Sequence, residues 1–139
     1  MTPRFLLDTG IVSAPMLKTP NPAIVRRLEE HGYESAIAAP VWHELMYGCS
    51  RLPAGRRRQA LECYLRDVVQ GSFPILAYDE AAAAWHGIER TRLESLGKAA
   101  PFTDGQIAAV AHINGLTLAT LNVRDFSGFK DLDVTNWLA

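Results

Sequence analysis

Residues 103–120 read TDGQIAAVAHINGLTLAT, and this stretch decides the fold of the chain. It predicts a helix that begins at Asp104 with Thr103 as its cap, because a threonine oxygen accepts hydrogen bonds from the free N–H groups at a helix start. Apolar residues at helical spacing form the expected inner face: Ile107, Ala108, Val110, Ala111 and Ile113. Gly115 ends this helix, and Leu116–Thr120 follows as an apolar strand. A helix that leads directly into a buried strand is typical of α/β proteins.

The same alternation of strands and helices continues on both sides of this stretch. Phe5–Leu7 predicts a short buried strand that stops at the turn-forming Asp8-Thr9-Gly10. Further helices are predicted over Pro22–His31, Pro40–Leu52, Arg56–Val69 and Asp79–Leu96, and further strands over Ser35–Ala38, Phe73–Tyr78 and Val134–Leu138. Leu121–Gly128 is predicted to be a polar turn. This order predicts a mainly parallel central sheet covered on both faces, in a single three-layer α/β/α domain over residues 1–139.

Composition limits the class of protein. A length of 139 residues, with 48% hydrophobic and 21% charged residues, is typical of one soluble globular domain. The net charge is −1, so any binding of nucleic acid must depend on local groups. Cys49 and Cys63 lack metal-ligand spacing and are interpreted as small buried hydrophobic residues, with a disulfide as the less favoured alternative. No apolar run is long enough for a signal peptide or a membrane span, which predicts a cytoplasmic protein with no membrane partner.

Five polar residues stand at edges of the predicted core: Asp8, Glu44, Asp104, Asn122 and Asp125. Asp8 ends the first strand and Asn122 follows a later one, and the carboxyl ends of parallel strands form the usual ligand site of such sheets. Two unit charges about 4 Å apart cost about 4 kcal/mol at an effective dielectric near 20, so gathered carboxylates require shared protons or a bound cation. Oxygen ligands suit Mg²⁺ or Mn²⁺ rather than zinc, and Mg²⁺ prefers a phosphate as a remaining ligand. The pattern therefore favours metal-dependent phosphodiester chemistry.

Each acid also has an ordinary structural explanation. Asp8 can simply form a turn, and Asp104 can complement the dipole of its helix. Glu44 can face solvent, and Asp125 can be a loop residue. His43 adjoins Glu44, but adjacent helical residues point about 100° apart, so His43 is expected at the surface rather than as a shared ligand. Only the joint order of the acids along an α/β chain favours a common site.

Four segments carry a family resemblance: Leu6-Leu7-Asp8-Thr9, Glu44-Leu45-x-x-Gly48, Asp104-Gly105-Gln106-Ile107-Ala108-Ala109 and Ala119-Thr120-Leu121-Asn122-Val123-Arg124-Asp125-Phe126. They resemble, in order, the signature motifs of VapC-type PIN-domain toxins from bacterial toxin–antitoxin pairs. The resemblance covers residues 5 to about 137. It implies a PIN-like fold, an endoribonuclease that depends on Mg²⁺ or Mn²⁺ and cuts structured RNA, a homodimer, and inhibition by a cognate VapB-type antitoxin.

The resemblance also implies roles for individual residues. The implied catalytic residues are Asp8, Glu44, Asp104, Asn122 and Asp125. All of these except Asn122 would be metal ligands, with Asn122 and Asp125 covering a fourth, more variable position. Thr9 and Thr120 match hydroxyl residues that help to organise the site. Arg124 would contact RNA or the antitoxin.

The sequence departs from the family pattern at three places. Gly10 replaces the usual Asn, Leu121 replaces an Arg, and Thr135-Asn136-Trp137 replaces a common Asn-Pro-Trp ending. The loss of an amide near Asp8 and of a phosphate contact leaves an alternative open: a catalytically weak PIN-fold module that mainly binds an antitoxin or RNA. A metal-dependent phosphatase or a DNA nuclease is a more distant alternative.

Overall fold

The computed structural model describes residues 2–138 of the chain. Its strands are β1 (Phe5–Leu7), β2 (Ser35–Ala38), β3 (Ile75–Leu76), β4 (Thr117–Ala119) and β5 (Val134–Thr135). Its α-helices are α1 (Thr9–Ser13), α2 (Pro22–His31), α3 (Ala39–Ser50), α4 (Arg56–Cys63), α5 (Gln70–Ser72), α6 (Glu80–Ser95), α7 (Phe102–Ile113) and α8 (Val123–Phe126). Two 3-10 segments, η1 (Ala14–Met16) and η2 (Gly32–Glu34), and one π-helical segment, η3 (Tyr64–Val69), complete the order.

The five strands form one parallel sheet in the order β3-β2-β1-β4-β5. The central strand β1 pairs with β2 through Leu6 and Ala36, and with β4 through Leu6 and Leu118. The chain builds the sheet outward from β1 through β2 to β3, and then returns to add β4 and β5 on the other side. The change of direction falls between β1 and β4, and in open α/β sheets this switch point is where ligands bind.

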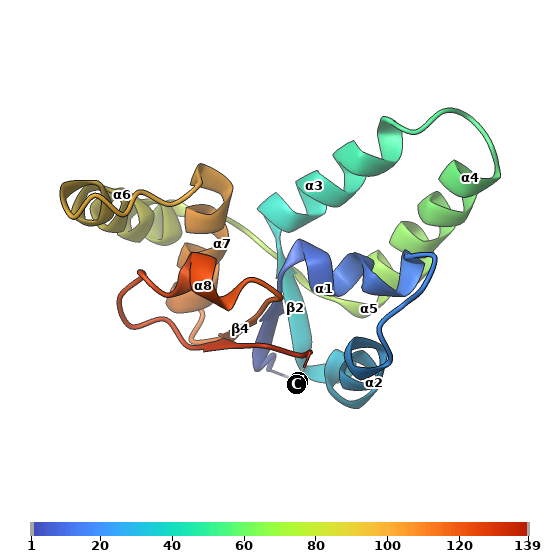
Figure 1. Ribbon diagram of the computed structural model, residues 1–139, viewed down its shortest axis with the longest axis horizontal. Coiled ribbons are helices and arrows are strands. Elements are labelled where there is room, and N and C mark those ends of the chain that lie inside the picture. Colours follow the sequence, from blue (N-terminus) through green and yellow to red (C-terminus); the bar gives the residue numbers. More distant parts are fainter. Residues whose placement is uncertain (1, 139) are drawn as a thin grey trace.

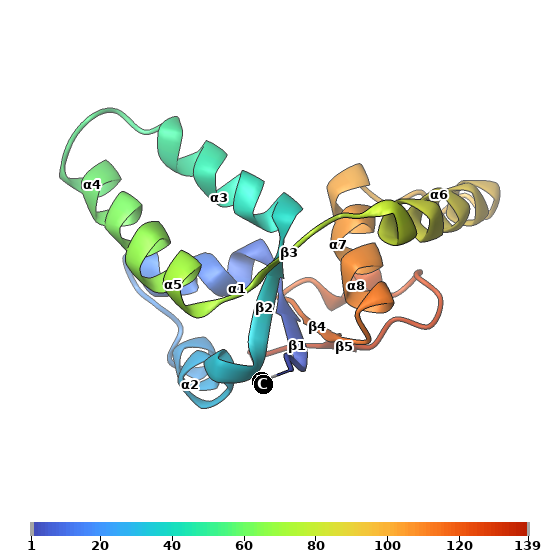
Figure 2. The same cartoon turned by 180° about the vertical axis from the view of Figure 1, so that it is seen from behind.

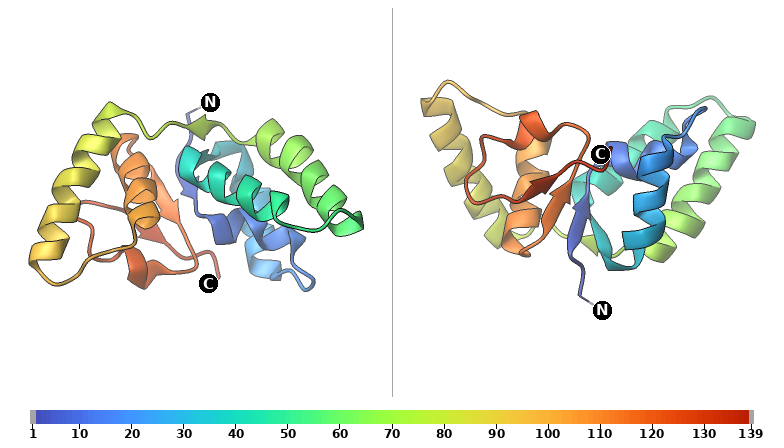
Figure 3. Two further views of the ribbon diagram at one scale, coloured as in Figure 1. Left: turned by 90° about the horizontal axis from the view of Figure 1, so that it is seen from above. Right: turned by 60° about the horizontal axis from the view of Figure 1, so that its bottom comes forward.

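Helices cover both faces of the sheet, as predicted. Figures 1 and 2 show α6, α7 and α8 on one side of the strands and α1 to α5 on the other. Figure 3 shows the sheet between these two groups, with α6 packed along α7. The three-layer α/β/α architecture with a parallel sheet is therefore confirmed.

The core lies between the sheet and these helices. Leu6, Leu7 and Leu118 of the central strands are completely buried, and so is the Ile107–Ala111 face of α7. Near the chain's end, Trp137 is also buried and packs edge-on against Phe5, with 5.4 Å between ring centroids. This burial of apolar side chains fixes where each strand ends, and so where the polar residues that follow β1 and β4 are placed.

The structure corrects the predicted start of α7 and the segment after β4. The helix begins at Phe102, not at Asp104, and Pro101 occupies the cap position, so Thr103 lies inside the first turn. The earlier start brings the Phe102 ring to 5.0 Å from the His86 ring. Ile113, expected on the inner face, is exposed. The predicted turn after β4 contains the short helix α8, whose Phe126 is buried in the core.

Three smaller differences concern the middle of the chain. The predicted helix over Arg56–Val69 becomes π-helical from Tyr64 onward, and β3 has only two residues of the predicted strand. Cys63 is exposed rather than buried, and both cysteines are free. Within residues 2–138, no helix is both long and apolar enough to cross a bilayer.

Candidate active site

Asp8 is held at the end of β1 by two hydrogen bonds, one to each carboxylate oxygen. The backbone N–H of Thr9 donates to Oδ1 at 2.8 Å, where α1 begins, and the hydroxyl of Thr120 donates to Oδ2 at 2.8 Å. Thr120 is completely buried at the end of β4, and its Oγ1 accepts the backbone N–H of Asn122 at 3.0 Å. These bonds connect the ends of the two strands that flank the switch point, and they fix the direction of the Asp8 carboxylate.

Glu44 reaches the same place from the second turn of α3. The Thr9 hydroxyl donates to its Oε1 at 3.2 Å, so that α1 and α3 are connected across the sheet edge. The Glu44 side chain is exposed apart from this contact. Thr9 and Thr120 thus each hold one acid of the predicted set, through their hydroxyl groups.

Asp104 lies in the first turn of α7 and completes the group. Its pKa is raised from 3.8 to about 6, first because burial disfavours the charged form, and then because Asp8, Asp125 and Glu44 repel that charge. Repulsion of this kind falls off with distance, so the four carboxyl groups share one region of the molecule. We call them the acid cluster: Asp8, Glu44, Asp104 and Asp125.

The acid cluster fits a hard divalent cation by the chemistry of its donors. All four groups offer oxygen, and repulsion by the other three acids adds to the effect of burial in raising the pKa of Asp104. In residues 2–138, no three histidine, cysteine or carboxylate side chains are grouped closely enough to coordinate one ion together. Mg²⁺ commonly keeps several waters and uses only one or two protein carboxylates directly, so such a grouping is not required for its binding.

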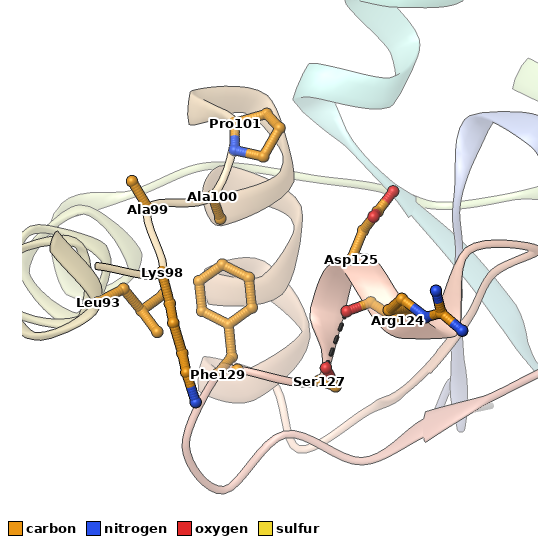
Figure 4. Close-up of a pocket in the computed structure, with 10 residues that line it drawn as sticks. Leu93, Lys98, Ala99, Ala100, Pro101, Arg124, Asp125, Ser127 and Phe129 are labelled. Atoms are coloured by element: carbon orange, nitrogen blue, oxygen red, sulfur yellow. Dashed lines mark hydrogen bonds between the residues drawn. The ribbon is translucent and has the colours of Figure 1, made fainter. Parts of the chain in front are cut away.

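The remaining predicted residues lie around α8. Asp125 and Arg124 are exposed on this helix, and both line a cavity of about 380 Å³ together with Lys98 and Phe129. Figure 4 shows the Asp125 carboxylate and the Arg124 guanidinium directed away from the Phe129 ring. The Asn122 amide group forms no hydrogen bond within the described part of the chain; the backbone of this residue instead bonds to Thr120 and Asp125.

Gly10 and Leu121, two of the departures from the family pattern, lie against each other. A Cβ added at position 10 would lie 3.3 Å from Leu121 Cδ1, so the small residue leaves room for the large one. Asp8 needs no amide from position 10, because both its oxygens already have donors. The two substitutions therefore form a matched pair and leave the Asp8 carboxylate fixed.

Sequence reasoning missed a buried support behind Asp104. His86 of α6 is only 3% exposed, and its Nδ1 lies 2.9 Å from the Tyr78 hydroxyl. Its other ring nitrogen lies against Gly105, where any Cβ would overlap the imidazole. Burial lowers the pKa of His86, and Arg90 nearby acts in the same direction, so the ring is neutral at physiological pH. A glycine inside a helical pattern, directly after a candidate ligand, was the available signal.

Comparison with known proteins agrees with this arrangement. The PIN domain family matches residues 5–133. Toxin FitB of Neisseria gonorrhoeae is 35% identical over an alignment of 135 residues that covers 93% of this chain and 93% of its own. The tRNA(fMet)-specific endonuclease VapC of Shigella flexneri is 30% identical over 138 residues, covering 96% of this chain and 98% of its own.

Solved structures are also similar to this chain over nearly its whole length. The crystal structure of FitAcB from Neisseria gonorrhoeae matches with a TM-score of 0.88 and 31% identity, over 96% of this chain and 97% of that one. The match to the family covers strands β1 to β4 and all four signature segments. The chain therefore belongs to the PIN-domain family, as a protein of the VapC type.

Proposed function

We propose that the chain is a metal-dependent endoribonuclease that hydrolyses phosphodiester bonds of structured RNA, and that it is the toxin of a type II toxin–antitoxin pair. One observation carries the proposal: the fold gathers the acid cluster at the switch point of the sheet without a cation to balance it. No lysine or arginine of residues 2–138 forms an ion pair with any of the four acids. Relatives that carry the names ribonuclease and endonuclease support the same activity.

The acid cluster would hold Mg²⁺ or Mn²⁺, with Asp8 as the most firmly positioned ligand. When bound, such an ion supplies Lewis-acid chemistry at a phosphate oxygen and offsets negative charge there. The chain's own contribution is positioning: Thr9 and Thr120 orient Asp8, and Thr9 also orients Glu44. Arg124, exposed beside Asp125, is available to attract the RNA backbone.

A cognate VapB-type antitoxin is the proposed protein partner, and a homodimer the proposed assembly. Similarity to a relative named toxin FitB supports a toxin's role for this chain. An antitoxin that covers the acid cluster would have to present positive charge, because four carboxyl groups in one region repel an acidic segment. A cellular RNA substrate implies action in the cytoplasm.

The proposal is tested by incubating the purified chain with structured RNA in EDTA, Mg²⁺ or Mn²⁺, alongside an Asp104→Ala variant. We expect cleavage only by the wild type and only with an added ion. Single-stranded DNA and a phosphomonoester serve as control substrates for a DNA nuclease and a phosphatase. Cleavage in EDTA would exclude metal dependence. Equal inertness of both proteins under all conditions would overturn the ribonuclease proposal in favour of a binding module.

A further inference from the structure

A cavity of about 600 Å³ opens directly beside the acid cluster, and Glu44 is part of its wall. Its wall includes Pro40, His43 and Glu44 of α3, Tyr78 from the segment between β3 and α6, and Thr103 and Gln106 of α7. This volume lies within the range of about 300–1,000 Å³ that is usual for sites of small ligands. Glu44 belongs both to the cavity wall and to the acid cluster, so the two are continuous.

The topology places the cavity at the same sheet edge as the acids. Ala39 directly follows β2 and Ala77 directly follows β3, and both residues line it. The cavity thus lies beyond the carboxyl ends of β2 and β3, and Asp8 lies beyond that of the neighbouring strand β1. A linear polymer that binds across the acid cluster along this edge of the sheet would pass over the cavity.

Three polar side chains of the wall are available to a ligand. His43, Thr103 and Gln106 form no side-chain hydrogen bond within residues 2–138. Gln106 offers both a donor and an acceptor, and Thr103, one turn earlier on the same helix face, offers a hydroxyl. This set can read the edge of a planar heterocycle that carries both donors and acceptors.

Tyr78 contributes an aromatic wall that the structure holds in place. Its hydroxyl lies 2.9 Å from Nδ1 of the buried His86, and the two rings meet edge-on at 5.9 Å. An aromatic ring fixed in this way loses little side-chain freedom when a flat ligand stacks on it. Unpaired RNA bases are commonly recognised by stacking on aromatic side chains together with hydrogen bonds to their edges.

The charge of the wall selects a neutral ligand rather than a phosphate. Among the described residues that line it, Glu44 is acidic and none is lysine or arginine. A phosphate would be repelled by Glu44, whereas a neutral base would not. Glu44 could also attract an arginine side chain from a protein partner. A guanidinium group only donates hydrogen bonds, however, so it would leave the N–H donors of the Gln106 amide without an acceptor.

We propose that this cavity binds one unpaired base of the RNA substrate, next to the cleaved phosphodiester, with Tyr78 as the stacking surface and Gln106 and Thr103 as the groups that read the base edge. The inference rests on the proposed ribonuclease function and adds to it the recognition of a single-stranded nucleotide. Gln106 and Thr103 would determine base preference, and the acid cluster would remain responsible for cleavage.

The test uses an RNA that the wild type cleaves and a series of versions that lack one base at successive positions around the cleaved bond. We expect the loss of one particular base to slow wild-type cleavage about tenfold, because the stacking of a base on an aromatic side chain contributes about 1–3 kcal/mol. Gln106→Met should slow cleavage of the intact RNA and reduce the effect of that missing base, because the hydrogen bonds to the base edge are lost while stacking on Tyr78 remains. Thr103→Val gives a second, independent variant of the same wall.

Gln59→Met, on the exposed surface of α4, is the matched control and should behave as the wild type. If removal of the base slows wild type and Gln106→Met by the same factor at every position, the subsite is refuted while the ribonuclease stands. If both wall variants cleave normally but bind an arginine-containing peptide less tightly than the wild type, the cavity serves a protein partner and the proposal is wrong. If the wild type cleaves no RNA with Mg²⁺ or Mn²⁺, the proposed function fails first, and the subsite fails with it.

Discussion

Glu89 and Asp104 are both acids that the fold removes from bulk water, and their surroundings are opposite. Glu89, in α6, accepts two hydrogen bonds from Arg92 at 2.8 Å and one from the Lys130 backbone N–H at 2.8 Å. These partners hold its pKa below the usual range, chiefly through the Arg92 side chain. For Asp104, burial and then repulsion by three other acids raise the pKa to about 6.

The contrast separates a structural acid from one that awaits a cation. The charge of the Glu89 carboxylate is compensated within the protein, because the fold itself supplies the groups that donate hydrogen bonds to it. Asp104 and its three acidic neighbours have no lysine or arginine ion-pair partner within residues 2–138, so the folded state gains when a divalent ion supplies positive charge. Glu34 follows the pattern of Glu89: His31 and Arg4 bind its carboxylate, and its pKa is lowered.

The largest expected effect is on catalysis. Asp8→Asn and Asp104→Asn each remove one charged oxygen ligand with little change of shape, and each should reduce RNA cleavage at least about 100-fold, since even indirect supports of metal ligands contribute 10–100-fold. Asp79→Asn is the matched control: Asp79 caps α6 by accepting the Ala82 N–H, and asparagine caps equally well. Cleavage rates test the loss of activity, and circular dichroism spectra of each variant test whether the fold is retained. Normal turnover in both cluster variants would remove these acids from the mechanism.

Gly105→Ala tests the support behind Asp104. Its Cβ would overlap the His86 imidazole, so we expect a loss of about 1–3 kcal/mol in the free energy of unfolding, as is usual for overpacking. Gly87→Ala in α6 is the control, since a Cβ there meets no atom within 4 Å and the change should stabilise by about 0.5–1 kcal/mol. Urea unfolding gives both values.

Adding His86→Ala to Gly105→Ala makes room for the new methyl group. The double variant should therefore show a smaller cost than the sum of the two single changes. Strict additivity in the same urea experiment would mean that the packing of His86 against Gly105 does not restrain α7.

Glu89→Gln should destabilise the protein by about 1–2 kcal/mol, because charged hydrogen bonds to Arg92 and Lys130 are weakened. Since folding lowers the pKa of Glu89, its contribution is fully present above pH 4.5 and is lost as the pH falls through the lower folded-state value. The wild type and the variant should thus differ at pH 7 and converge in acid. Thermal unfolding as a function of pH measures the difference, and a constant gap down to pH 2 would contradict the assignment.

The smallest effect has the opposite sign. In EDTA at pH 7.5, Asp104→Asn should stabilise the chain by about 1 kcal/mol, because it removes a charge that three acids repel, in a site that solvent partly screens. The same variant that abolishes cleavage would then unfold at a higher temperature than the wild type. Destabilisation by this change would show that Asp104 has a structural partner, as Glu89 does.

Much of the fold was predictable, because it depends on periodicity. The buried strand before Asp8 and the apolar face of α7 are visible as short patterns. Gly115 follows the end of α7 with a φ of +67°, as predicted for a helix stop. The short helix α8 was not predicted, because one buried residue, Phe126, decides it through tertiary packing. The cap of α7 was misassigned because the contact between Phe102 and His86 joins residues far apart in the chain.

The candidate site was predictable in part. An acid beside an apolar run is an ambiguous signal: Glu34 directly precedes β2 as Asp8 directly follows β1, yet Glu34 is ion-paired. The strand polarity separates the two, since only the carboxyl ends of parallel strands form the ligand edge. Contacts such as those of Thr120 with Asp8, 112 positions apart, and of Tyr78 with His86 need the folded chain and leave no local pattern.

The most direct test of the central claim is thermal unfolding of the wild type, Asp104→Asn and Glu89→Gln, each in EDTA and in excess Mn²⁺. An ion that binds only the folded state raises the unfolding temperature of any protein that retains its site. We predict that Mn²⁺ raises the unfolding temperature of the wild type and of Glu89→Gln, and leaves that of Asp104→Asn almost unchanged. An equal rise in all three proteins, or no rise in the wild type, would contradict the claim that the acid cluster is completed by a divalent ion.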